Sequence, residues 1–179
     1  MAQLAASAEE AHGRLSGGRE RLAMAYEPRF DDRWPPSRVA SADVGGVASV
    51  LLHRLQDTRG RDIAARLTLT GPHRDDVALA LGGEPAASFA SRGQQRTAAL
   101  ALRLAEARYL RDVSGEQPVL LLDDVLSELD EHRRASVLDA IDADQMLITS
   151  PDPDRFASLI AAGARRWDVR GGCAVRGDR

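Results

Sequence analysis

Two adjacent carboxylates follow an apolar run in the second half of the chain. Residues 119–122 are uninterrupted apolar sequence, and Asp123 and Asp124 come directly after them. Such a run is typical of a strand buried on both faces of a parallel sheet, where ligands bind at the carboxyl ends of the strands. One carboxylate there can hold Mg²⁺ through water, and its neighbour can orient or deprotonate an attacking water. A strand that merely ends in an acidic turn is the alternative interpretation.

A second candidate lies about thirty residues earlier. Ser91 is a good N-cap residue, and Gln94 completes a capping-box pattern for a helix that runs to about Leu110. Gly93 permits close backbone approach, and the free N–H groups and positive dipole end of a helix favour an anion. The pattern predicts either an ordinary well-capped helix or a helix N-terminus aimed at a phosphate.

The acidic pair has the form of a Walker B element of phosphate-loop NTPases, but the matching phosphate loop is missing. Lys and Arg together number 24 in this chain, and every one of them is Arg. The Walker A loop needs a Lys that reaches the β- and γ-phosphates. This chain therefore contains a Walker B element without its phosphate cradle.

The composition of the chain argues against several other classes of function. The chain has 179 residues and a net charge of −3, so it has no overall basic field that predicts nucleic-acid binding. Aromatic residues make up 4%, which argues against a base-stacking platform. Cys173 is the single cysteine and has no internal disulfide partner. Because no apolar stretch is long enough for a membrane helix and no secretory signal begins the chain, we expect a cytoplasmic protein without a membrane partner.

The rest of the chain shows alternating helical and strand patterns. Helices are expected over 2–25 (in two pieces or with a break), 39–55 and 155–162, and a loop over 28–37. A strand, a loop and a second strand are expected over 61–81, ending in a hairpin turn at Gly82-Gly83. Residues 146–150 are expected to form the next parallel strand, and 166–175 a closing hairpin. His12 and His53 are isolated, and we expect both to be solvated.

Three motifs taken together resemble the RecF family of ABC-type ATPase heads. They are Gly-Pro-His-Arg-Asp-Asp at 71–76, Ser-Arg-Gly-Gln-Gln-Arg-Thr at 91–97 and Leu-Leu-Leu-Asp-Asp-Val-Leu-Ser-Glu-Leu-Asp at 120–130. The resemblance is dense over 68–149 and diffuse before it. It implies an ATP-dependent DNA-binding protein that forms an ATP-dependent homodimer, acts with RecO and RecR at single-strand gaps in DNA, and helps to load RecA.

The resemblance also assigns roles to individual residues. Asp123 would serve Mg²⁺ through water, and Asp124 would take the catalytic place where most ABC proteins have Glu. Thr149 and Ser150 would stand at the switch position, where many have His. The signature motif, which contacts the γ-phosphate of ATP held by the opposite subunit, would comprise Ser91, Arg92, Gly93, Gln94 and Gln95. The D-loop at the dimer interface would comprise Ser127, Glu128, Leu129 and Asp130.

The implied fold is α/β, a portion of an ABC-type ATPase head with a partly parallel sheet and flanking helices. Residues 1–60 would be the helical end of an inserted lobe, and residues 61–179 the C-terminal part of the ATPase domain. In this family the Walker A loop precedes the lobe, so this chain alone is expected to be inactive as an ATPase. Two alternatives remain: another DNA-repair head of the ABC or chromosome-maintenance type, and a non-catalytic interaction module from a truncated paralogue.

Overall fold

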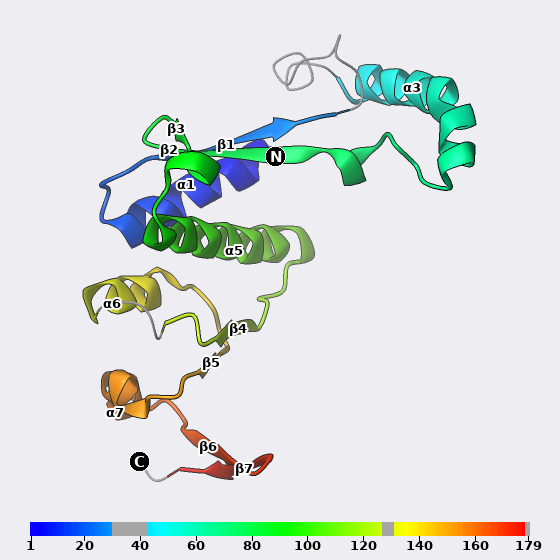
Figure 1. The fold of residues 1–179 in the computed structure, drawn as a ribbon. Coiled ribbons are helices and arrows are strands. Elements are labelled where there is room, and N and C mark those ends of the chain that lie inside the picture. Colours follow the sequence, from blue (N-terminus) through cyan, green and yellow to red (C-terminus); the bar gives the residue numbers. More distant parts are fainter. Residues whose placement is uncertain (30–42, 127–130, 178–179) are drawn as a thin grey trace. The chain divides into compact units, whose positions relative to one another are not determined.

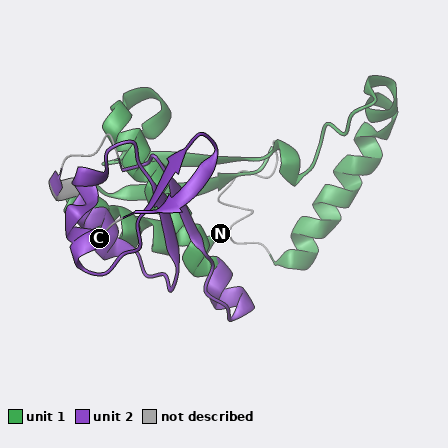
Figure 2. Ribbon diagram, turned by 90° about the horizontal axis from the view of Figure 1, so that it is seen from below, with its two compact units in different colours: residues 1–109 green, residues 110–179 purple. Residues whose placement is uncertain are grey.

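The structure is a computed structural model that describes residues 1–29, 43–126 and 131–177 (Figure 1). The chain divides into two compact units, residues 1–109 and residues 110–179 (Figure 2). In the described residues, no helix combines the length and the apolar character that a membrane span requires. The expected boundary at residue 60 stays a prediction.

The first unit contains a small antiparallel sheet. Its strands are β1 (Leu22–Glu27), β2 (Asp76–Leu81) and β3 (Glu84–Pro85), in the order β1-β2-β3. Leu22 pairs with Leu81 at one end of the β1–β2 ladder, and Glu27 pairs with Asp76 at the other. The turn into β3 uses Gly82 and Gly83, both at positive φ, which confirms the predicted hairpin.

The N-terminal segment corrects one prediction, because residues 22–25 are not helical. Helix α1 (Ala2–Ser16) ends where Gly17 adopts a left-handed conformation, and β1 begins at Leu22. In β1, Leu22 is buried and the neighbouring Ala23 is exposed, as the two-residue period of a strand requires. The prediction that His12 is solvated is also wrong, since it is 1% exposed on the inner face of α1.

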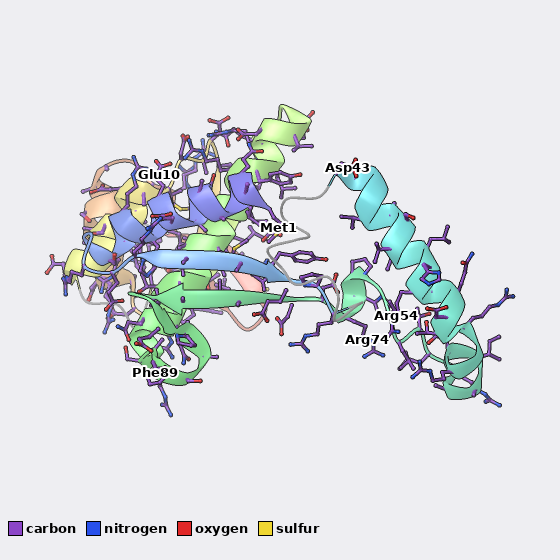
Figure 3. The ribbon with its side chains drawn as sticks, turned by 90° about the horizontal axis from the view of Figure 1, so that it is seen from above. Met1, Glu10, Asp43, Arg54, Arg74 and Phe89 are labelled. Atoms are coloured by element: carbon purple, nitrogen blue, oxygen red, sulfur yellow. The ribbon has the colours of Figure 1, made fainter. Side chains whose placement is uncertain are left out.

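Helix α3 (Val44–Ala65) is longer than predicted. The Asp43 side chain caps it by accepting a hydrogen bond from the Gly46 N–H at 2.6 Å (Asp43 is labelled in Figure 3). The helix continues through Ile63, so the strand expected before the 70–76 loop is wrong. Ile63 is 68% exposed, which shows that an apolar residue here need not mark a buried strand. The 3-10 turn η1 (Pro72–Arg74) follows, and helix α4 (Ala86–Phe89) comes after β3.

Helix α5 (Arg92–Ser114) begins where the capping pattern predicted. Its buried face, together with the buried residues of α1, β1 and β2, supplies apolar core residues of the first unit. Those residues are Ala8, Leu15, Leu22, Leu81, Ala98, Leu100, Ala101 and Ala105. Small residues dominate the α5 contribution, which permits close helix packing.

The second unit has a parallel pair of strands, β4 (Leu120–Asp123) and β5 (Met146–Thr149), as predicted. Helix α6 (Glu131–Ala140) lies between them in the chain, which is the element order of a βαβ unit. After β5 come η2 (Pro153–Phe156) and α7 (Ala157–Ala161). The predicted closing hairpin is present as β6 (Trp167–Arg170) and β7 (Cys173–Arg176).

One face of the β4–β5 pair is not covered. Leu122 is buried, but Leu121 is 69% exposed and its partner in the ladder, Leu147, is 51% exposed. The expectation that β4 is buried on both faces is therefore wrong for this chain. Within the described residues this sheet has only two strands, and the face that carries Leu121 and Leu147 stays largely exposed.

Candidate functional site

The ends of β4 and β5 bring Asp123 and Thr149 together. The two residues are paired in the parallel ladder, so both lie at the carboxyl edge of this sheet. The Thr149 hydroxyl donates a hydrogen bond to Asp123 Oδ1 at 2.5 Å and accepts one from the Asp124 N–H at 3.0 Å. A single hydroxyl thus fixes the Asp123 carboxylate and the backbone that carries Asp124.

Asp124 has an unusual backbone conformation. Its φ of 53° lies in the left-handed region, which costs most L-residues about 1–2 kcal/mol. Asp and Asn enter this region more readily than other non-glycine residues. An Asp at this position therefore suits the turn that leaves β4, and a Glu would fit it less well.

The donor set at this edge suits a hard divalent cation. Mg²⁺ prefers oxygen ligands and keeps several of its waters, so one or two carboxylates are enough to hold it. Asp123 and Asp124 are both exposed, and the Thr149 hydroxyl occupies only one oxygen of Asp123. Across the described residues, there is no cluster of three or more His, Cys, Asp or Glu side chains that could form an all-protein cage. The residues present therefore fit a Mg²⁺ held largely through water.

Ser150, the second residue predicted at the switch position, is engaged in a local turn. Its hydroxyl donates to the Asp152 carbonyl at 3.2 Å and accepts from the Asp152 N–H at 3.1 Å. The Asp152 side chain in turn caps η2 by accepting from the Asp154 N–H at 3.2 Å. Of the two residues predicted at the switch position, Thr149 is the one that contacts the acidic pair.

The signature segment forms the reciprocal capping box that the sequence predicted. The Ser91 N–H donates to Gln94 Oε1 at 2.6 Å, and the Gln94 N–H donates to Ser91 Oγ at 3.3 Å. Ser91 is exposed, and no residue in the described part of the chain accepts its hydroxyl proton. That proton is available to a ligand in front of the helix.

The other signature residues lie on the same first turn. Gln95 Nε2 donates to the Ala90 carbonyl at 3.1 Å, and the Gly93 carbonyl accepts from the Thr97 hydroxyl at 2.9 Å. Arg92 is exposed. The predicted D-loop, Ser127 to Asp130, lies outside the described residues. The predicted signature segment belongs to the first compact unit, and the acidic pair belongs to the second.

Sequence reasoning missed two sets of contacts near these motifs. Glu20 accepts a hydrogen bond from Gln94 Nε2 at 2.5 Å, and no local pattern signals a contact 74 residues apart. Tyr26 donates its hydroxyl to Asp75, the first aspartate of the 71–76 motif, which also accepts from the Arg29 N–H at 2.8 Å. Burial, followed by the hydrogen bond and charge of Asp75, raises the pKa of Tyr26 to about 12. The acidic end of that motif therefore anchors the end of β1.

Comparison with known proteins finds matches along nearly the whole chain. No family model matches it. A protein from Synechocystis named DNA replication and repair protein RecF is 43% identical over 173 residues, covering 96% of this chain and 43% of that protein. Proteins of the same name from Roseiflexus castenholzii and Symbiobacterium thermophilum are 41% and 40% identical over 89% and 99% of this chain. The chain spans less than half the length of these curated relatives.

Solved structures agree with the sequence matches. A structure of the recombination mediator protein RecF-ATP in the RecFOR pathway superposes with a TM-score of 0.72 at 27% identity, covering 99% of this chain and 44% of that one. The corresponding RecF-ATPrS structure gives a TM-score of 0.70 and covers 98% of this chain. The likeness extends over both compact units.

Proposed function

Because this chain belongs to the RecF family over the part of those proteins that it spans, we propose that it carries the signature and Walker B portions of a RecF-type DNA replication and repair ATPase. The observation that supports this most strongly is the Asp123–Thr149–Asp124 arrangement at the carboxyl edge of a parallel sheet. Open α/β sheets bind their ligands at this edge.

The proposed roles follow from the chemistry of the side chains. Asp123 would hold a Mg²⁺ ion through water, and that ion would supply charge neutralisation at the phosphates of ATP. Asp124 orients the attacking water and accepts its proton. On the first unit, Ser91 donates its free hydroxyl proton to a γ-phosphate oxygen, and Gly93 lets the backbone approach that phosphate. The ATP that Ser91 contacts is the one held by the opposite subunit. The phosphate loop that holds each ATP must come from outside this chain, since the chain has no Lys.

The remaining features of the complete protein are proposed from its relatives. ATP held between two subunits would join them into a homodimer on DNA, with the segment Ser127–Asp130 at their interface. The RecFOR pathway named for the solved relatives implies RecO and RecR as partners at gapped DNA, with RecA loading as the outcome. The cell compartment that this function requires is the cytoplasm.

A non-catalytic interaction module is the second candidate, and one observation favours it. The exposed Leu121–Leu147 pair leaves an apolar face on β4 and β5, and such a face supports packing against further structure. A chain that paired with a separate head without hydrolysing ATP would also need such a face. The two candidates differ in whether Asp124 and Ser91 matter to nucleotide turnover.

The test uses this chain joined to the part of the Synechocystis relative that it does not span, referred to below as the joined protein. Light scattering should show that ATP converts it from monomer to dimer. Ser91→Arg should leave monomers that still bind ATP, because the bulky side chain blocks the contact across the interface. A dimer that forms equally well with Ser91→Arg would contradict the assignment and favour the non-catalytic module.

A further inference from the structure

Glu20 connects the loop after α1 to the signature motif. Its carboxylate accepts a hydrogen bond from Gln94 Nε2 at 2.5 Å. Hydrogen bonds to a charged acceptor are shorter and roughly twice as strong as neutral ones. Glu20 and Gln94 are both half-buried, so water competes for this bond less than it does at an open surface.

The partners of Gln94 fix the orientation of its side-chain amide. The backbone N–H of Ser91 can only donate, so it must face the amide oxygen, which it meets at 2.6 Å. The carboxylate of Glu20 can only accept, so it must face the amide nitrogen. Exchanging the oxygen and nitrogen would break both bonds. Glu20 therefore locks the rotamer through which Gln94 holds the Ser91 backbone.

The loop that carries Glu20 is itself held on both sides. The Gly18 N–H donates to the Gly13 carbonyl at 2.8 Å, which closes the end of α1. The Arg21 carbonyl accepts from the Gly82 N–H at 3.0 Å, and the Arg21 side chain pairs with Glu9 at 2.6 Å. Glu20 thus approaches α5 from a fixed backbone.

We propose that Glu20 is a positioning residue for the signature motif, acting through Gln94 to hold Ser91 in place for a phosphate. Gln94 is then part of the support of Ser91, and each polar atom of its amide already makes one hydrogen bond within the chain. The proposal rests on the proposed function, because only a nucleotide bound in front of α5 gives the position of Ser91 a purpose.

Hydrogen exchange in the 179-residue chain tests the positioning itself without nucleotide. Glu20→Ala removes the acceptor of the Gln94 side-chain amide. Exchange of the backbone amide protons of Ser91 and Gln94 should then become about tenfold faster, which is the scale of one hydrogen bond to a charged group. Glu20→Gln keeps an oxygen acceptor and should restore protection to within about twofold of the wild type. Unchanged exchange in Glu20→Ala, or no rescue in Glu20→Gln, would overturn the proposal.

Glu10→Ala is the matched control. Glu10, labelled in Figure 3, pairs with Arg108 Nη1 at 2.8 Å, so it also connects α1 to α5, but away from the signature motif. Its loss should leave the exchange of the Ser91 amide proton unchanged, since an exposed ion pair contributes little to stability. If Glu10→Ala raises this exchange rate as much as Glu20→Ala does, any contact between α5 and the residues packed on it would have the same effect, and the proposal would be overturned.

The ATP dependence of dimerisation in the joined protein then distinguishes a failure of this inference from a failure of the proposed function. The ATP concentration that half-saturates dimerisation should rise several-fold in Glu20→Ala, recover in Glu20→Gln and stay constant in Glu10→Ala. If Ser91→Arg abolishes dimerisation while Glu20→Ala leaves it unaltered, the role of Glu20 is refuted and the proposed function stands. If Ser91→Arg also has no effect, the proposed function itself fails.

Discussion

Thr149, at the end of β5, donates its hydroxyl to the carboxylate of Asp123, at the end of β4, over 2.5 Å. The Thr149 hydroxyl oxygen also accepts a hydrogen bond from the Asp124 N–H. Thr149, which we predict to stand at the switch position, therefore contacts the acidic pair within the same chain. It links the two acidic residues and fixes their geometry.

The first prediction concerns this hydroxyl. Thr149→Val keeps the shape and the strand propensity but removes both hydrogen bonds, so the free energy of unfolding should fall by about 1 kcal/mol. Thr149→Ser keeps the hydroxyl and should lose less. Urea unfolding of both variants, followed by circular dichroism, measures the difference. Equal stability of Thr149→Val and the wild type would show that the hydroxyl does not hold the acidic pair.

The second prediction concerns the backbone at Asp124. Its left-handed conformation suits Asp and Asn better than Glu, so Asp124→Glu should destabilise the chain by about 1 kcal/mol, whereas Asp124→Asn should be nearly neutral. Thermal unfolding of the two variants gives the comparison. A fully stable Asp124→Glu protein would mean that the turn relaxes and that Asp is not required by the backbone.

The sequence predicted the parts of the site that depend on local pattern. The capping box of Ser91 and Gln94 and the strand before Asp123 follow from spacing alone, and the structure contains both. A capping box is specified within four residues, so no distant part of the fold can alter it easily.

The sequence predictions failed where tertiary packing, and not local pattern, determines the structure. The stretch with Leu22 and Met24 has strand alternation, yet it follows an Ala-rich helix and reads as its continuation until its partner at 76–81 is known. His12 lies in a polar stretch of sequence, between Glu10 and Arg14, and only the packing of α1 shows that it is buried. The contact of Glu20 with Gln94 joins residues that no periodicity relates.

The third prediction is a pH dependence at Tyr26. The pKa of this hydroxyl is raised to about 12 from an ordinary value of 10, so the folded state holds its proton more tightly than the unfolded state. The stabilisation is complete below pH 10 and is lost as the pH rises toward 12, because the unfolded chain then releases the proton first. Stability should therefore fall with rising pH over this window.

Tyr26→Phe is the control for this prediction. Removing the hydroxyl should flatten the stability profile between pH 10 and 12 relative to the wild type, although Asp75 then loses one of its donors. The ultraviolet difference spectrum of the two proteins should show one tyrosine titrating near pH 12. A difference spectrum that titrates near pH 10 would contradict the Tyr26–Asp75 contact.

ATP turnover by the joined protein and its Asp124→Asn variant tests the central claim most directly, with the 179-residue chain alone as the control. Asp124→Asn keeps the size and the backbone preference of Asp but removes the base, so turnover should fall by about 10²–10⁴-fold. ATP binding should persist, and the ATP-bound dimer should accumulate on DNA. The chain alone should show no turnover, since it has no phosphate-loop Lys. Normal turnover by Asp124→Asn, or magnesium-dependent turnover by the chain alone, would contradict the account.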